Sequence, residues 1–307
     1  MQNMHGHDRA GTHGDTCSMR LASWNWGGRP HAGTVSADGR ELTPLAVSEP
    51  ERGALSLVRT LAYGDALPPP AGPRLPLEAV TLRAPLPRPR RNLFCVGRNY
   101  RSHAAELSTT VFRDAVAGAD DWPIVFTKLP ETVVGPHDDV RLPGRAVSEQ
   151  IDYESELAVV IGRRGRDIPR SRAMDHVCGY TVINDVSARD VQVRHQQWHL
   201  GKSFDTFCPM GPWIVTADEL DGRGLRVRGW VNAELRQDGN TRDLIFDIPT
   251  LIETCSRGIT LYPGDVIATG TPSGVGMGFS PPRWLKPGDV VRVEIDGIGA
   301  IKNRFVQ

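Results

Sequence analysis

The chain has 307 residues, enough to bury a sizeable hydrophobic core, and its 36 basic and 36 acidic side chains give a formal net charge of zero. This balance provides no electrostatic basis for binding nucleic acid or an acidic membrane surface. Five cysteines are scattered without a Cys-x-x-Cys pair, so neither a disulfide framework nor a zinc ribbon is indicated. No segment approaches the ~20 apolar residues of a membrane-spanning helix, and the first residues lack the apolar stretch of a signal peptide. We therefore expect a cytoplasmic protein.

The N-terminal third of the sequence predicts a tail followed by a small domain. Residues 1–18 are rich in Gly, His and Asp without periodicity, which is typical of a disordered segment. Short strands and turns follow from Met19, with one helical stretch over residues 51–63. A proline-rich stretch, LPPPAGPRLP, comes next. We interpret residues 19–90 as a small N-terminal domain and its linker.

The rest of the chain predicts a β-rich domain. Residues 91–307 are dense in β-branched runs separated by Pro and Gly turns, and long amphipathic helices are few. The phrase Pro-Gly-Asp-Val occurs at residues 263–266 and again at 287–290, and each time an apolar run follows. Asp296-Gly297 stands between two further runs as a hairpin turn. The fold class expected is α+β, rich in strands.

Three acidic residues are candidates for a metal site. In IDYESELAVVI, an extended strand would direct Asp152, Glu154 and Glu156 to one face. The apolar run that follows predicts entry into the core, where ionised carboxylates are unfavourable unless a cation compensates them. Asp185 ends another buried strand, CGYTVIND, before a helix that Ser187 could cap. We predict Glu154, Glu156 and Asp185 as ligands of Mg²⁺ or Mn²⁺. The alternative is a solvated strand face and a plain helix cap.

A histidine and a glutamate are candidates for proton transfer. His103 and Glu106 stand three residues apart in YRSHAAEL, so a helix beginning near Ser102 would place them on one face. A carboxylate partner raises the basicity of an imidazole and fixes its tautomer, which suits a general base. The alternative is an exposed helix pair without a chemical role.

Further polar residues would contact a small anionic substrate. Arg189 and Gln192 are three apart after Asp185, and Lys202 would add positive charge for a carboxylate or a developing enolate. Thr271 lies in the glycine-rich turn GTPSGVG, which brings backbone amides and a hydroxyl close to a ligand. Taken singly, each of these residues is more often a surface polar residue or part of an ordinary turn.

Six phrases of the sequence resemble the fumarylacetoacetate hydrolase family. In chain order they are NLFCVGRNYRSHAAE, PIVFTKLPETVVGPHDDVRLP, IDYESELAVVIGR, NDVSARDVQ, GKSFDTFCPMGPW and GDVIATGTPSGVG. The resemblance implies a mixed β-roll catalytic domain, usually dimeric. It also implies Mg²⁺ or Mn²⁺ bound at Glu154, Glu156 and Asp185, a catalytic pair at His103 and Glu106, and substrate contacts at Arg189, Gln192 and Lys202. The additional acidic ligand of the eukaryotic fumarylacetoacetases has no clear counterpart.

The resemblance and the site residues together predict a metal-dependent hydrolase. We expect cleavage of a C–C bond in a β-diketone such as an acylpyruvate or fumarylpyruvate, in aromatic catabolism, with Lys202 beside the catalytic pair. Decarboxylation or tautomerisation of oxaloacetate and isomerisation of a 2-hydroxyhepta-2,4-diene-1,7-dioate are alternatives, since all use the same enolate. A ligand-binding module that keeps only the fold is the non-enzymatic alternative. Residues 107–122 are expected to form a lid, and the protein to be a homodimer.

Overall fold

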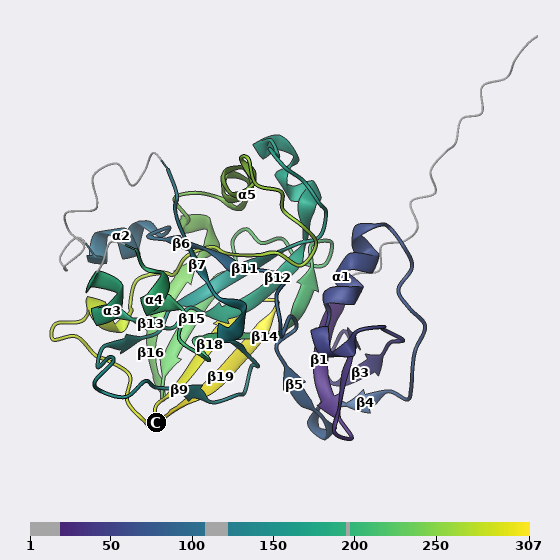
Figure 1. Ribbon diagram of the computed structural model, residues 1–307, viewed down its shortest axis with the longest axis horizontal. Coiled ribbons are helices and arrows are strands. Elements are labelled where there is room, and N and C mark those ends of the chain that lie inside the picture. The colour runs from purple at the N-terminus through teal and green to yellow at the C-terminus, as the bar shows by residue number, and fades with distance from the viewer. Residues whose placement is uncertain (1–18, 108–121, 195–196) are drawn as a thin grey trace, which may run out of the picture.

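The computed structural model describes residues 19–107, 122–194 and 197–307 (Figure 1). The predicted disordered tail and nearly all of the predicted lid lie outside these residues. Within them, no helix is long and apolar enough to cross a membrane.

Most strands belong to one large mixed sheet. Its main path runs β4 (Leu75–Pro76), β3 (Glu41–Pro44), β2 (Arg29–Val35), β1 (Arg20–Trp26), β14 (Cys208–Thr216), β12 (Val177–Asn184), β11 (Ser155–Ile161), β17 (Val266–Ala268), β6 (Leu93–Gly97) and β7 (Ile124–Lys128). Beside this path, β5 (Thr81–Arg83) pairs with β1 and β8 (Val133–Val134) pairs with β14. Neighbours are antiparallel except for the β17–β6 and β14–β8 pairs.

A second sheet lies against the central strands of the first. Its order is β16 (Glu234–Asn240), β15 (Arg226–Val231), β18 (Val290–Ile295), β19 (Gly299–Val306) and β9 (Val140–Arg141). A short pair joins β10 (Ile151–Asp152) to β13 (Ser187–Ala188). The helices are α1 (Leu55–Ala62), α2 (Arg101–Leu107), α3 (Arg189–Arg194), α4 (His199–Lys202) and α5 (Ile248–Ser256). This arrangement confirms the predicted β-rich α+β class.

The central strands β11 and β12 carry nearly continuous apolar runs because both of their faces are covered. Every residue of β11 is buried, and β11 and β12 contact β15 and β18 of the second sheet. A strand that is covered on both faces loses the alternation of polar and apolar residues. Any polar side chain on β11 is therefore enclosed in the protein and must find a partner there.

The predicted turns near the C-terminus are confirmed. Each Pro-Gly-Asp-Val phrase leads directly into a strand, β17 or β18. Asp296-Gly297 lies in the turn between β18 and β19, which pair in register from Val290↔Arg304 to Ile295↔Gly299. The helix predicted over residues 51–63 begins at Leu55, after a 3₁₀ turn at Pro50–Arg52.

The N-terminal segment is joined to the rest of the protein through the large sheet. Strand β1 pairs with β14, with Leu21 opposite Ile214 (Figure 1). Leu21 belongs to one buried cluster together with Ile214 of β14 and Val160 of β11. Residues 19–90 thus share hydrogen bonds and core with the residues after them. A separate small domain over that range stays a prediction.

The shared core predicts that the N-terminal segment unfolds together with the rest of the protein. Leu21→Ala should lower the free energy of unfolding by about 2–5 kcal/mol, because it removes buried methyl groups and leaves a cavity. The half-exposed Leu235 is the control, since Leu235→Ala should change that free energy by less than about 0.5 kcal/mol. Both variants are followed by thermal denaturation. A separate, early transition that appears only in Leu21→Ala would show that the segment is an independent domain.

Candidate functional site

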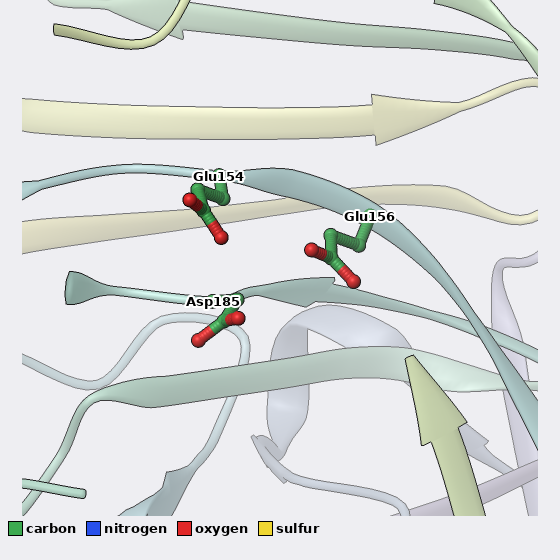
Figure 2. A group of neighbouring side chains, drawn as sticks. All are labelled: Glu154, Glu156 and Asp185. Carbon is green, nitrogen blue, oxygen red and sulfur yellow. The ribbon is translucent and has the colours of Figure 1, made fainter. Parts of the chain in front are cut away.

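Three buried carboxylates converge where β11 and β12 run side by side. Glu156 is on β11, Glu154 immediately precedes that strand, and Asp185 immediately follows β12. Ser155 pairs with Asn184, and the Asp185 amide donates a hydrogen bond of 2.9 Å to the Glu154 carbonyl, so the two chain segments are held in register. One oxygen from each carboxylate lies within 4.8 Å of the others, and Figure 2 shows the three side chains on neighbouring strands.

Asp152 does not join these three residues, although strict strand alternation would place it with them. The chain is extended at β10, leaves regular strand geometry at Tyr153 and Glu154, and becomes a strand again at Ser155. This interruption breaks the alternation of side chains. Asp152 instead forms a 2.9 Å salt bridge with Arg189. It also accepts hydrogen bonds from the backbone amides of Gly276 at 2.6 Å and Met277 at 3.0 Å.

Three buried cations surround the carboxylates. The Lys202 ammonium lies 2.6 Å from Glu154 and 2.8 Å from Asp185. Lys128, which is fully buried, lies 2.8 Å from the other oxygen of Asp185 and also donates to the carbonyls of Val186 and Lys202. The Arg189 guanidinium lies 2.7 Å from Glu154 as well as bonding Asp152. These contacts fix the positions of Glu154 and Asp185.

The charges of this cluster leave one carboxylate in excess. Lys128, Arg189 and Lys202 balance the three acids to which they are bonded, namely Asp152, Glu154 and Asp185. Burial opposes ionisation of Glu154, but the charges of Lys202 and Arg189 outweigh it and hold its pKa well below the usual range. Burial, followed by the neighbouring Asp185 and Glu154, raises the pKa of Glu156 well above its usual value.

The surplus charge and the donor chemistry fit a divalent cation. Glu156 accepts a 2.9 Å hydrogen bond from the Gly270 amide, which offsets only part of a buried negative charge. Carboxylate oxygens are the ligands that hard cations such as Mg²⁺ and Mn²⁺ prefer. A cation held by Glu154, Glu156 and Asp185 would compensate the remaining charge and favour the ionised form of Glu156.

The histidine–glutamate pair lies beside the carboxylates. His103 is 3% exposed, and its Nδ1 atom lies 2.8 Å from Glu106, which is 15% exposed. Both residues come from α2, which begins within one residue of the position expected from the sequence. The other oxygen of Glu106 accepts a 2.8 Å hydrogen bond from the Gly274 amide. A Cβ at Gly278 would lie only 2.1 Å from Glu106, so a larger residue there would displace the Glu106 side chain.

One pocket joins these groups. It is lined by polar residues from both the carboxylate cluster and α2, and by aromatic side chains. The lining residues are Val96, Gly97, Arg98, His103, Phe126, Glu154, Glu156, Arg189, Gln192, Trp198, Lys202 and Thr271. Of the residues predicted as site residues, Glu106 and Asp185 lie behind this lining, in contact with His103 and Lys202 respectively.

Two predicted substrate contacts are held in the pocket by buried partners. Gln192 accepts a 3.0 Å hydrogen bond from Arg189, as expected for residues three apart on α3. The Thr271 hydroxyl accepts a 2.8 Å hydrogen bond from Gln237, whose own carbonyl oxygen accepts from the Ser155 amide at 3.0 Å. The predicted cap at Ser187 is wrong: Ser187 lies in β13 and donates to the Asp185 carbonyl.

Four residues of the site were not predicted from the sequence: Lys128, Asp152 as a partner of Arg189, Arg98 and Gln237. Lys128 ends a strand, β7, and a lysine at a strand end usually reaches solvent. Gln237 lies in β16, whose sequence reads as polar and exposed. Arg98 had the clearest signal in the sequence, because it follows an apolar strand and precedes the helix that carries His103.

A comparison with protein families matches residues 92–306 to the family described as "Fumarylacetoacetate (FAA) hydrolase C-terminal". Oxaloacetate tautomerase YisK of Bacillus subtilis is 50% identical over 230 residues, which cover 75% of this chain and 74% of that protein. The mitochondrial oxaloacetate tautomerase FAHD2B of Bos taurus is 43% identical over 292 residues, covering 90% and 88% of the two chains.

Solved structures agree with the family and the fold. A fumarylacetoacetate hydrolase from Exiguobacterium antarcticum superposes with a TM-score of 0.80 at 41% identity, covering 94% of this chain and 99% of that one. A 2-hydroxyhepta-2,4-diene-1,7-dioate isomerase from Mycobacterium marinum gives a TM-score of 0.75 at 34% identity, covering 94% and 98%.

These names overturn the expectation of a C–C bond hydrolase of the acylpyruvase or fumarylpyruvate type. The two relatives above, 50% and 43% identical, are called oxaloacetate tautomerases, and one similar structure is called an isomerase. The physical reason for the error is that one metal-stabilised enolate serves cleavage, decarboxylation and tautomerisation alike, so the site residues do not separate these reactions. The chain belongs to the fumarylacetoacetate hydrolase family.

Proposed function

We propose that this protein is a metal-dependent oxaloacetate tautomerase, which interconverts the keto and enol forms of a small 2-oxo dicarboxylic acid. The observation that carries the proposal is a single pocket that joins the carboxylate triad to the His103–Glu106 pair. The names of the relatives support this substrate. The reaction needs only a group that moves a proton on carbon and a positively charged environment for the enolate oxygen.

The metal, Mg²⁺ or Mn²⁺, would be held by Glu154, Glu156 and Asp185. When bound, it supplies the Lewis acidity that polarises the C1 carboxylate and the C2 oxo group of the substrate. Lys128 and Lys202 hold Asp185 from both of its oxygens. Arg189 and Lys202 hold Glu154 in the same manner. These residues keep the ligand set in place without rearrangement when the substrate arrives.

His103 is the proposed proton-transfer group. Its Nδ1 atom is bonded to Glu106, which leaves Nε2 to take a proton from C3 of the keto form. The electron pair of the broken C3–H bond then forms the C2–C3 double bond, while the π pair of the C2–O bond moves onto the oxygen to give an enolate. Water donates a proton to this oxygen, and the hydroxide that results takes the proton from His103, so the enol leaves and the imidazole is neutral again. The return reaction delivers the proton from His103 to C3. Glu106, fixed by the Gly274 amide, stabilises the protonated imidazole between these steps.

The remaining predicted residues position the substrate. Gln192 and Thr271 present an amide and a hydroxyl to the pocket, and both are held by buried neighbours. Lys202 adds positive charge where the enolate oxygen forms. A buried polar group that is already oriented loses little conformational entropy when it binds a ligand.

Isomerisation of a 2-hydroxyhepta-2,4-diene-1,7-dioate is a second candidate, favoured by the similar structure from Mycobacterium marinum. Its chemistry is the same movement of a proton between carbon and oxygen or between carbons. The two candidates differ in substrate length, so a direct comparison of both substrates separates them.

The first prediction from this proposal concerns the outcome of the reaction. In D₂O and Mg²⁺, the wild-type protein should accelerate exchange of the C3 protons of oxaloacetate and the decay of its enol absorbance. The carbon skeleton should stay intact, because proton transfer breaks no C–C bond. Proton NMR measures exchange and cleavage together. Cleavage products that accumulate as fast as exchange occurs would contradict the proposal.

The second prediction concerns the metal. Asp185→Asn should weaken Mn²⁺ binding by more than about 100-fold. Removing a residue that only hydrogen-bonds a metal ligand typically lowers metal affinity by about 10- to 100-fold, and removing the ligand itself should lower it further. The variant should also lose the rise in thermal unfolding temperature that Mn²⁺ gives the wild type. Isothermal titration and thermal unfolding measure both effects. Asp205, which is exposed, provides the matched control Asp205→Asn. Full wild-type activity in excess chelator would refute a metal-dependent reaction.

The third prediction concerns His103. His103→Ala should lower kcat for C3 proton exchange by roughly 10²- to 10⁴-fold, the usual contribution of a general base. Mn²⁺ affinity should change little, because His103 is not one of the proposed ligands. The exposed His137 supplies the control, since His137→Ala should leave kcat unchanged. Undiminished exchange in His103→Ala would remove this residue from the mechanism.

A further inference from the structure

The pocket contains an arginine, Arg98, to which the sequence assigned no role. Arg98 lines the same pocket as His103 and the carboxylate residues, and it is only 5% exposed. It comes from the short connection between β6 and α2. A buried arginine offers a planar fork of donors that matches a carboxylate with two parallel hydrogen bonds.

The backbone at Arg98 is held in an unfavourable conformation by its neighbour. Its φ angle is +55°, a region that residues other than glycine seldom adopt. Asn99 fixes the connection, because its side-chain amide donates to the carbonyls of Phe246 at 2.9 Å and Thr269 at 2.8 Å. The Asn99 side-chain oxygen accepts from the Phe246 amide at 2.7 Å. A strained residue maintained by several neighbouring bonds is a feature of functional sites.

A chain of aromatic contacts connects Arg98 to the carboxylate cluster. The Arg98 guanidinium lies 6.0 Å from the centre of the Trp198 ring. Trp198 packs against Phe126 with ring centres 5.4 Å apart, and the Lys202 ammonium lies 4.8 Å from the Phe126 ring. Trp198 and Phe126 thus form an apolar side of the pocket, with Arg98 near the Trp198 ring and Lys202 near the Phe126 ring. Gly97 permits this packing, since a Cβ there would lie 2.4 Å from the Trp198 ring.

The cations that line the pocket come from different segments of the chain. Arg189 and Lys202 are salt-bridged to the carboxylates of the proposed metal site, so their charge stabilises those acids. Arg98 belongs to another segment and packs on Trp198. A 2-oxo dicarboxylate has one carboxylate beside its oxo group, which the metal site would take, and a second at its far end. Transfer of this second carboxylate from water into a buried pocket is unfavourable unless a cation in the pocket pairs with it.

We propose that Arg98 binds the distal carboxylate of the substrate and so selects 2-oxo dicarboxylates over 2-oxo monocarboxylates. This assignment rests on the proposed function. The guanidinium lies over the Trp198 ring, which limits where it can move within the pocket. The position of Arg98 sets the distance between the two anionic ends that the pocket accepts.

The test compares two ligands that differ only at the distal end. Malate and 2-hydroxybutanoate both carry a 2-hydroxy acid for the metal, but malate has a carboxylate where 2-hydroxybutanoate has a methyl group. Their dissociation constants are measured on the Mn²⁺-loaded full chain by titration calorimetry. The wild type should prefer malate, and Arg98→Met should reduce that preference by about 10²-fold, the usual loss when one partner of a buried charge pair is removed. Binding of 2-hydroxybutanoate and of Mn²⁺ should stay within about threefold of the wild type.

Two further variants make the result decisive. Arg101→Met removes an exposed arginine three residues away and should leave the malate preference unchanged. Arg98→Lys keeps the charge but loses the fork, so the preference should fall partway. If Arg98→Met does not fold, the lysine variant decides. A wild type without a malate preference, or a preference unchanged in the Arg98 variants, would overturn the assignment. A finding that the protein does not tautomerise oxaloacetate would refute the proposed function but not the role of Arg98, because the ligand comparison measures binding without turnover.

Discussion

The packing of ionised carboxylates inside a β-sheet is the constraint on which this structure depends. Glu154, Glu156 and Asp185 lie at the ends of two strands that are covered on both faces, where water cannot solvate them. Uncompensated charges there would be unfavourable by many kcal/mol. Three buried cations balance the acids that they contact, and the three carboxylates lie close enough together that they could hold a metal ion.

The same constraint explains why the site is built from segments far apart in the chain. Lys128 comes from β7 and Lys202 from α4, and both reach Asp185 at the end of β12. The stretch from the end of β17 into the 3₁₀ segment at Gly276–Gly278 supplies amides to Glu156, Glu106 and Asp152 in succession. Each amide donates to a carboxylate that would otherwise be left with fewer partners in a buried environment. Two of the glycines here, Gly276 and Gly278, lie where a Cβ would meet the Asp152 and Glu106 carboxylates, whereas Gly270 and Gly274 adopt a positive φ of +102°.

Sequence reasoning located the groups whose chemistry is local and missed those whose role depends on tertiary contacts. The His103–Glu106 pair follows from helical spacing, and the end of β12 at Asn184 follows from an apolar run that stops before an acid. Asp152 was expected to lie with Glu154 and Glu156, but it bonds Arg189, and neither proline nor glycine marks the interruption of the strand at Tyr153 and Glu154. Lys128 bonds Asp185, and Gln237 bonds Ser155, so both partners lie at least 57 positions away in the chain. Nothing in the sequence next to Lys128 or Gln237 indicates such a distant buried partner.

The site residues that were predicted from the sequence do not determine whether the enzyme cleaves a bond or only tautomerises its substrate. A metal site and a histidine that moves a proton at C3 serve either reaction, because both pass through an enolate. Cleavage additionally requires a carbonyl beyond C3 and room for an attacking water. A substrate that ends in a carboxylate one carbon beyond C3 has no such electrophile, since an ionised carboxylate resists attack. Under the proposed function, a cation that binds this ending therefore excludes hydrolytic cleavage by selecting substrates without a second ketone, whereas proton transfer and decarboxylation both remain chemically open.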